Sequence, residues 1–233
     1  MAAAFVKSVS GQNTGAVTLV LPAFTGSVTA GNLIVVHAGR HNTAGSTLSV
    51  SDNKGNSYSM AVGPTTLGNG RAYIFYSVVD TGGTNFIITI TASASSIHTA
   101  AAAEYSGVAT STPLDQIAAA TGNGTAASSG ATPTTTQANE LIMGMVYSPP
   151  NVPTISAGAT FTFRVNRVNN SRGSILLEDK NVTSTGTQTA TGTISATNDW
   201  IAQCATFKEA GAAVVFPQEP AVIRQAVGRS FSW

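Results

Sequence analysis

Charge is scarce in this chain. Only 9% of its 233 residues are charged, 11 basic and 10 acidic, and the formal net charge is +1. Soluble domains usually carry about 25% charged residues. A nucleic-acid surface needs clustered Lys and Arg to displace counterions from phosphates, and the basic residues here are spread thinly. Helices with solvated faces also need Glu, Lys and Arg. The composition therefore disfavours both a nucleic-acid-binding protein and a helical one.

Cysteine and long apolar runs are scarce as well. Cys204 is the only cysteine, so no disulfide can form within the chain. It lies in the apolar run 200–207 with no His or orienting carboxylate nearby, which indicates a small core residue and not a nucleophile. No apolar stretch approaches the ~20 residues that span a bilayer. Residues 1–8 lack the pattern of a secretory signal. We expect a protein made in a cytoplasm, which stays there or leaves by assembly and lysis.

Thr, Ser, Asn, Ala and 23 Gly take the place of the missing charge, and such a composition suits strands with Thr-rich wet faces. Short apolar runs recur, and several alternate with a period of two, as half-buried strands do. Residues 71–79 are apolar on both faces, which predicts a central strand covered on both sides. Residues 100–103 are bounded too closely for a stable helix, so we expect a strand. The clearest further strands are 16–21, 33–38, 85–91, 141–147, 160–165, 174–177 and 199–207.

Turn-forming residues separate these runs. The segments 52–56 (Asp-Asn-Lys-Gly-Asn) and 81–84 (Thr-Gly-Gly-Thr) contain residues that tolerate the positive φ of tight turns. We therefore predict a hairpin at each, with antiparallel neighbours. Roughly a dozen strands or more are too many for one open sheet, so they should stack in two sheets. No internal repeat of fixed period is evident.

These patterns predict an all-β protein with two regions. Residues 1–208 should form a two-sheet antiparallel β-sandwich of the jelly-roll or concanavalin-like kind. Within it, residues 121–139 should form a surface excursion with one edge strand. Residues 209–233 begin with a linker-like Glu-Ala-Gly-Ala-Ala and should form a C-terminal tail outside the sandwich.

A set of short motifs resembles a known type of module. The motifs are Gly-Asn-Leu-Ile-Val-Val at 31–36, Ser-Asp-Asn-Lys-Gly-Asn-Ser-Tyr at 51–58, Ala-Glu-Tyr-Ser-Gly-Val at 103–108, Pro-Leu-Asp at 113–115 and Ala-Asn-Glu-Leu-Ile at 138–142. Together they resemble a jelly-roll or lectin-like β-sandwich module of uncharacterised bacterial surface proteins and phage structural proteins. The resemblance spans about residues 16–207. It implies a fold class and an extracellular or virion setting, and it implies no reaction.

The sequence shows no complete catalytic, cofactor or metal site. His37 and His41 have the spacing of a metal pair on a helix, but Gly39 breaks helix, so we expect a loop-exposed pair. The segment 52–56 has oxygen ligands, but Lys54 occupies its middle and no distal Glu follows, so a turn is preferred to a calcium loop. We therefore predict no bound metal or cofactor.

The acidic and aromatic residues do not indicate an enzyme either. Glu178 and Asp179 are adjacent and would point to opposite faces of a strand, so they cannot form a glycosidase pair by themselves. Glu104 and Glu140 could join them only across the sandwich. The Tyr and Trp residues lie mostly in strands, where they would fill the core. If a glycan is bound, Tyr58 and the loops near His41 are the candidates.

The C-terminal tail is the predicted partner-binding element. Pro220 can start a short helix and Gly228 can stop it. A helix of about eight residues does not hold alone, so its apolar stripe must dock or stay disordered. The predicted partner-binding residues are Val214, Val215, Phe216, Val222, Ile223, Val227, Phe231 and Trp233. The tail could also fold back over its own sandwich.

From these observations we expect a non-enzymatic virion structural protein, a phage head-decoration, fibre or tail component. Its partners would be other virion proteins and copies of itself, with surface glycans as a further option, and neither nucleic acid nor a membrane. The low charge supports this expectation because it weakens repulsion between copies. The alternative is a carbohydrate-binding module of a bacterial surface protein, and a glycan-cleaving enzyme comes third.

Overall fold

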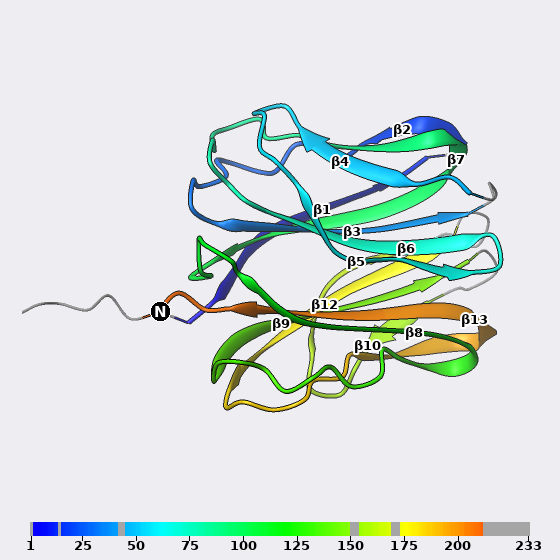
Figure 1. The fold of residues 1–233 in the computed structure, drawn as a ribbon. Coiled ribbons are helices and arrows are strands. Elements are labelled where there is room, and N and C mark those ends of the chain that lie inside the picture. Colours follow the sequence, from blue (N-terminus) through cyan, green and yellow to red (C-terminus); the bar gives the residue numbers. More distant parts are fainter. Residues whose placement is uncertain (1, 14, 42–44, 150–153, 169–172, 212–233) are drawn as a thin grey trace, which may run out of the picture.

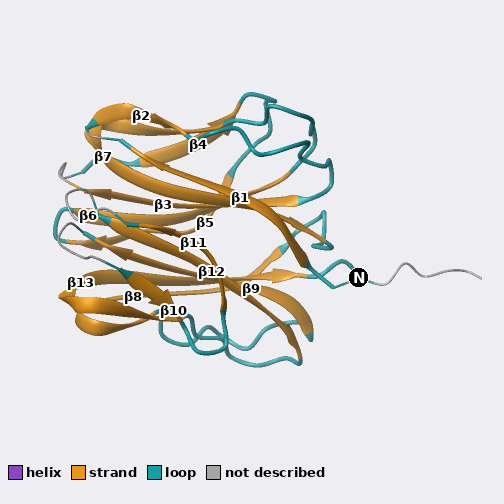
Figure 2. Cartoon of the chain, turned by 180° about the vertical axis from the view of Figure 1, so that it is seen from behind, coloured by secondary structure: helices purple, strands orange, loops and turns teal. Residues whose placement is uncertain are grey.

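The computed structural model describes residues 2–13, 15–41, 45–149, 154–168 and 173–211. Within these ranges the chain forms thirteen strands in antiparallel sheets packed face to face, and no helix (Figures 1 and 2). A helix that could cross a membrane is accordingly not found in the described part. The strands are β1 (Ala4–Gln12), β2 (Ala16–Val20), β3 (Leu33–His41), β4 (Leu48–Asp52), β5 (Ser59–Leu67), β6 (Gly70–Val78), β7 (Ile88–Ser106), β8 (Leu114–Ser128), β9 (Asn139–Ser148), β10 (Ile155–Ala157), β11 (Thr162–Arg167), β12 (Ser174–Thr183) and β13 (Thr191–Lys208).

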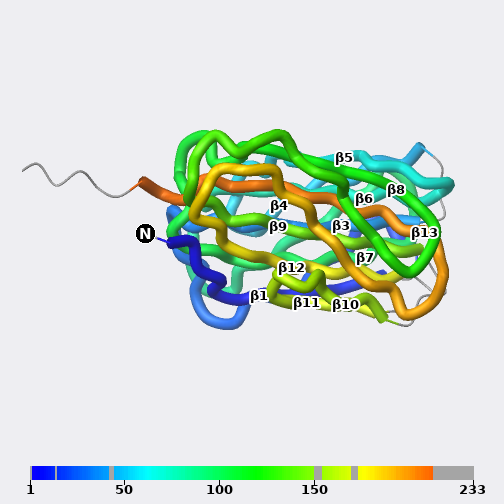
Figure 3. Tube along the Cα trace, turned by 90° about the horizontal axis from the view of Figure 1, so that it is seen from below, coloured from blue at the N-terminus to red at the C-terminus, as the bar shows by residue number. Residues whose placement is uncertain are grey.

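Each sheet takes its strands from one half of the chain. The first has the order β1-β7-β3-β6-β5, and β2 and β4 pair with the first part of the long strand β7. The second has the order β10-β13-β9-β12-β11, and β8 pairs with β13. The predicted all-β two-sheet sandwich is therefore confirmed. Figure 1 shows the first sheet above the second, and Figure 3 views the chain from below, where the strands of the two sheets overlap.

The two halves repeat one topology. The order β1-β7-β3-β6-β5 recurs as β8-β13-β9-β12-β11, and β4 lies on β7 as β10 lies on β13. The registers agree as well, because Leu33 pairs with Tyr105 in the first sheet and Leu141 pairs with Phe207 in the second. The two halves are thus structural repeats of each other, a relation that the sequence did not reveal.

Irregularities recur at the same positions. The edge strand β5 has a register shift between Met60 and Val62, and its equivalent β11 has one between Phe163 and Val165. The offset between equivalent residues is 108 for Leu33 and Leu141 but 102 for Tyr105 and Phe207, because the loops of the halves differ in length. A search for a fixed period misses such a repeat.

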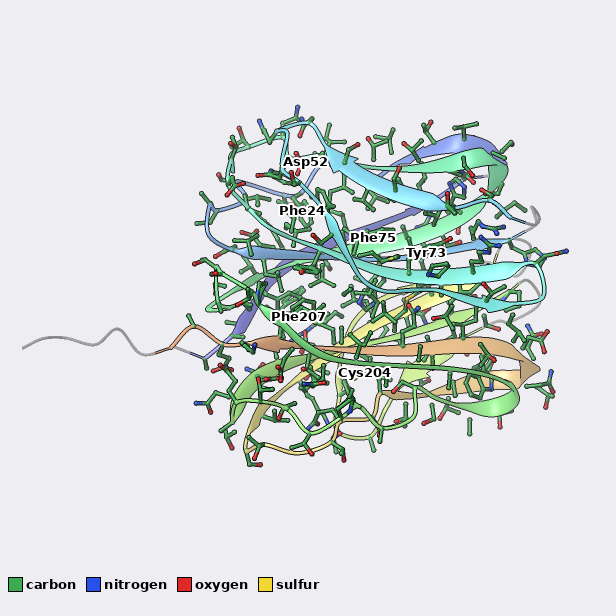
Figure 4. All side chains as sticks on the ribbon, in the orientation of Figure 1. Phe24, Asp52, Tyr73, Phe75, Cys204 and Phe207 are labelled. Carbon is green, nitrogen blue, oxygen red and sulfur yellow. The ribbon has the colours of Figure 1, made fainter. Side chains whose placement is uncertain are left out.

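A shared apolar core joins the halves. It contains inward residues of β3, β6 and β7 from the first sheet and of β9, β12 and β13 from the second, with Leu33 and Leu141 among the equivalent pairs. Gly39 and Tyr147 occupy equivalent positions and touch each other, so that a Cβ on Gly39 would overlap the Tyr147 ring. A residue that contacts its own equivalent marks a two-fold axis. Phe207 lies in this layer between the sheets (Figure 4).

Contacts away from the axis come in related pairs. The Tyr105 hydroxyl donates to Asp179 Oδ2 (2.6 Å). The equivalent contact joins Phe207 to Tyr76, whose rings meet edge to face at 5.4 Å. Such reciprocity is what an isologous dimer interface shows. The packing between the halves is therefore that of a pseudo-dimer within one chain.

Each half also has an outer core. In the first half, outward residues of β3 and β6 such as Tyr73 and Phe75 pack under Phe24 and the first part of β7 (Figure 4). In the second half a smaller outer core contains Trp200, and next to it Cys204 lies among apolar neighbours. β6 is thus covered on both faces, as its two-sided apolar pattern predicts, and residues 100–103 lie within strand β7.

The two predicted hairpins are wrong. β4 pairs with β7 and β5 pairs with β6, so the turn at 52–56 connects two layers. The turn at 81–84 likewise connects β6 to β7, which are not neighbours in the sheet. Local turn chemistry specifies the reversal of the chain and not the partner of the next strand. The edge strand predicted within 121–139 is confirmed: it is the second part of β8, which among the named strands pairs with β13 alone.

The backbone pairing continues just past β13. Glu209 N–H donates to Asn139 O (3.1 Å) and Ala210 N–H donates to Gly107 O (2.8 Å). The rest of the predicted tail, residues 212–233, lies outside the described residues.

The pseudo-axis contact can be tested by Gly39→Ala. The added methyl overlaps the Tyr147 ring, and overpacking of a core usually costs about 1–3 kcal/mol. We expect this loss of unfolding free energy in urea denaturation. Gly186→Ala is the matched control, because nothing lies within 4 Å of its new Cβ, and it should change stability by less than ~0.5 kcal/mol. Equal stabilities for the two variants would contradict the packing.

Candidate functional site

A cavity of about 330 Å³ opens between the sheets where β1, β11 and β12 meet. Its lining combines the start of β1 with polar side chains of β11 and β12. The lining residues are Ala3, Ala4, Phe5, Tyr105, Leu141, Thr162, Arg164, Asp179, Lys180 and Asn181. Ligand sites usually occupy about 300–1,000 Å³, so the cavity has room for one small ligand.

Arg164 and Asp179 form a forked ion pair in this cavity. Arg164 Nε donates to Asp179 Oδ2 (2.6 Å) and Nη2 donates to Oδ1 (3.0 Å). The Arg164 side chain is 25% exposed and that of Asp179 only 5%, so the guanidinium faces the opening and the carboxylate lies behind it. Two-point pairing fixes the orientation of both planes.

Aromatic rings hold this pair on two sides. The Tyr105 hydroxyl donates to Asp179 Oδ2, and the Arg164 guanidinium carbon lies 4.4 Å from the centre of the Phe5 ring. Burial, together with the Asp179 carboxylate, raises the pKa of Tyr105 far above its ordinary value. The hydrogen bond to Asp179 raises the pKa of Arg164. The phenol therefore remains a proton donor and the guanidinium remains charged.

Local structure explains the two orientations. Side chains alternate along β12, so Asp179 faces the cavity while Glu178 faces the opposite side, where its Oε2 accepts from Gly158 N–H (2.7 Å). Arg164 stands at the bulge of β11, between the paired residues Phe163 and Val165. A bulge re-aims a side chain, which here brings the guanidinium to Asp179.

The histidines occupy different places from the predicted loop. His37 is fully buried within β3 and His41 ends that strand. On a strand, residues four apart lie about 13 Å from each other, so the two rings do not share a metal position. The expectation of a loop-exposed pair is wrong because the Gly39 backbone continues the strand. His98 Nε2 contacts the Ser96 hydroxyl at 2.6 Å.

Asp52 organises a turn. Its Oδ1 accepts from the N–H groups of Lys54 (2.8 Å) and Asn56 (3.2 Å), and its Oδ2 accepts from Asn56 Nδ2 (2.9 Å) and the Tyr58 hydroxyl (3.0 Å). These four bonds account for the segment as a side-chain-capped turn. Burial and Asp52 raise the pKa of Tyr58, and this tyrosine packs against the outer core, not into an open glycan site.

The glutamates do not meet across the sandwich. Glu104 accepts from Asn32 Nδ2 (2.6 Å) and pairs with Lys7 (3.2 Å) on the outer side of the first sheet. Glu140 is buried on the outer side of the second sheet, where burial raises its pKa to about 7. Burial also raises the pKa of Glu178 to about 7.

The remaining predicted positions are structural or undescribed. Cys204 is buried, as expected, and burial raises the pKa of its thiol to about 12. Within the described ranges no three His, Cys, Asp or Glu residues gather as metal ligands would. The partner-binding residues from Val214 to Trp233 lie outside these ranges, so their role stays a prediction.

Sequence reasoning missed Arg164, Asp179, Tyr105 and Phe5 as one group. One signal was present: Arg164 is the charged residue in the otherwise uncharged segment Phe-Thr-Phe-Arg-Val at 161–165. Comparison with protein-family models, curated proteins and solved structures finds no match to this chain.

The buried His37 makes stability pH-dependent. Burial lowers its pKa to about 3, whereas in the unfolded chain it is about 6.5. Above pH 6.5 both states are neutral. As the pH falls from 6.5 towards 3, only the unfolded state gains a proton, so this residue destabilises the fold. Its equivalent in the second half is Met145, which makes His37→Met the natural replacement.

We expect His37→Met to be more stable than the wild type by about 2 kcal/mol at pH 5, beyond any difference at pH 7.5. Urea denaturation of both proteins at the two pH values measures this, and the opposing contributions of Glu140 and Glu178 cancel because both proteins contain them. A stability difference that does not change with pH would contradict the assignment.

Proposed function

We propose that this protein is a non-enzymatic structural component of a virus-like particle, a phage head-decoration, fibre or tail protein, that works by assembling with copies of itself and with other virion proteins. The observation that carries the proposal is a matched pair of exposed apolar residues on the two edge strands. Met60 of β5 and Phe163 of β11 are equivalent by register and are 48% and 52% exposed.

Edge strands support assembly because they present unpaired backbone groups. Among the named strands, β5 pairs with β6 alone and β11 with β12 alone. An edge of this kind can pair with another chain, and covering the exposed half of Met60 or Phe163 contributes on the order of 1 kcal/mol. The pseudo-two-fold places one such edge in each half. A subunit with two similar contact surfaces can hold two neighbours at once, as a fibre or shell requires.

The apolar tail is the second element of the proposal. The segment 212–233 follows Gly211. The residue before that, Ala210, donates its N–H to Gly107 O at the end of the sandwich. It contains the predicted partner-binding residues from Val214 to Trp233. We propose that it acts as an arm that joins subunits. The setting would be a virion, which agrees with the resemblance to phage structural modules.

The cavity beside Arg164 favours a second candidate, a carbohydrate-binding module of a bacterial surface protein. Its polar groups are positioned by ion pairing and by aromatic rings, as the groups of a small-ligand site are.

Deleting residues 212–233 tests the assembly role. We expect the truncated chain to keep the β-type circular dichroism and melting temperature of the full chain, and to lose concentration-dependent association in sedimentation velocity. The substitutions Val222→Ser, Ile223→Ser and Val227→Ser together should have the same effect, since they remove the apolar stripe. Arg224→Ser with Gln225→Ser is the matched control and should leave association unchanged.

The edge strands form the other arm of this test. Met60→Ser with Phe163→Ser should weaken association without loss of stability, because both side chains are half-exposed in the single subunit. Association that is the same in the full chain, the truncated chain and the edge variant would contradict the proposal.

A further inference from the structure

The cavity beside Arg164 has a counterpart in the other half, and the counterpart is apolar. There the ring of Tyr76 meets Phe207 edge to face at 5.4 Å inside the core, and Ala61 stands at the bulge. The pairs of equivalent residues are Ala61 and Arg164, Tyr76 and Asp179, and Phe207 and Tyr105. Of the two equivalent positions, one is thus occupied by aromatic rings and the other is lined by an ion pair.

The difference is not required by the fold. The equivalent position shows that Ala61 and Tyr76 of the first half, with Phe207 of the second, pack the interface without a buried charge. Taking a carboxylate and a guanidinium out of water costs several kcal/mol per ion, and apolar replacements of such pairs are often neutral or stabilising. The ion pair of Arg164 and Asp179 is therefore better explained by a role in ligand binding than by a contribution to stability.

The open polar groups in the cavity define what it can hold. A guanidinium has five N–H donors, and Arg164 uses one on Nε and one on Nη2 for Asp179. Arg164 also hydrogen-bonds the Tyr105 hydroxyl, and its remaining donors belong to a side chain that is 25% exposed in the cavity lining. Thr162 and Asn181 add a hydroxyl and an amide at the lining, where Asn181 Nδ2 also donates to Ala3 O (2.7 Å) and holds the start of β1 in place.

The geometry points to a binding site for one neutral sugar ring. Arg164 and Asp179 cancel each other's charge, and the ammonium of the third charged lining residue, Lys180, lies over the Phe161 ring (4.7 Å), so the site has little attraction for a free ion. Sugar hydroxyls both donate and accept, which matches fixed guanidinium donors beside Thr162 and Asn181. The Phe5 ring, which has the Arg164 guanidinium over one face, adds apolar surface to the lining for the C–H groups of a sugar. The volume of about 330 Å³ suits a single ring. This inference rests on the glycan-binding candidate and is independent of assembly.

Saturation-transfer NMR on the full chain tests the site, with the methyl glycosides of glucose, galactose, mannose and N-acetylglucosamine as probes. We expect at least one of them to bind. The double variant Arg164→Ala with Asp179→Asn should bind it about tenfold or more weakly, since hydrogen bonds to a charged group are lost. The double variant leaves no buried unpaired carboxylate. Arg167→Ala is the matched control, because it removes the same charge from the exposed end of β11, and it should bind like the wild type.

Thr162→Ala gives a second measurement that depends less on stability, because Thr162 is exposed and lines the cavity, and it should also weaken binding. The chain without residues 212–233 should bind the glycoside as the full chain does, so a failure of assembly and a failure of this site remain separate results. Three results would overturn the inference: no glycoside binds the wild type, the double variant binds as tightly as the wild type, or acetate or phosphate binds in place of every glycoside.

Discussion

The inner faces of the two sheets bury one continuous apolar layer between them, and the side chains that fill it come as equivalent pairs from the two halves. Where two equivalent positions meet, Gly39 leaves room for the Tyr147 ring, so this contact between the sheets depends on a residue without a side chain. Away from that point Leu33 and Leu141 lie in the same layer from opposite sides. Neither half could leave this face in water, since at about 25 cal/mol per Å² of apolar surface the lost burial would exceed the marginal stability of a domain. The packing of one half on the other is therefore a condition of stability.

Once the halves are packed in this way, positions outside the layer are free to differ. At one of the two equivalent interface positions the rings of Tyr76 and Phe207 meet, while the other position is a cavity lined by Arg164 and Asp179. The edge strands β5 and β11, by contrast, carry similar residues at equivalent positions. Each exposes an apolar side chain, Met60 or Phe163, beside its bulge. We thus propose function at two kinds of place. Ligand binding is proposed where equivalent positions of the two halves hold different residues, and assembly is proposed where equivalent edge strands both expose an apolar residue.

The sequence could predict what depends on local periodicity. Alternation revealed the strands, and the two-sided apolar pattern of 71–79 revealed the doubly covered strand β6. The sequence could not predict which strands pair. Asp52 forms its turn through its own hydrogen bonds, and these do not depend on which strand the next segment pairs with. The actual tight hairpin, with Leu67 paired to Gly70, was overlooked. The repeat was hidden because 33–36 and 141–144 share only Leu-Ile, although they fill equivalent positions. The cavity could not be predicted either, since it joins β1, β7, β11 and β12 through tertiary packing alone.

The central claim is that the two halves unfold as one body because they share their core. The most direct measurement follows urea unfolding by two probes in the variant Trp233→Phe, which leaves Trp200 as the single tryptophan. Far-ultraviolet circular dichroism reports the strands of both halves, and Trp200 fluorescence reports the second half alone. The shared core predicts coincident transitions with one midpoint, the mark of two-state unfolding. Circular dichroism that falls in two steps, with the fluorescence change confined to one of them, would show that the halves are independent and would contradict this account.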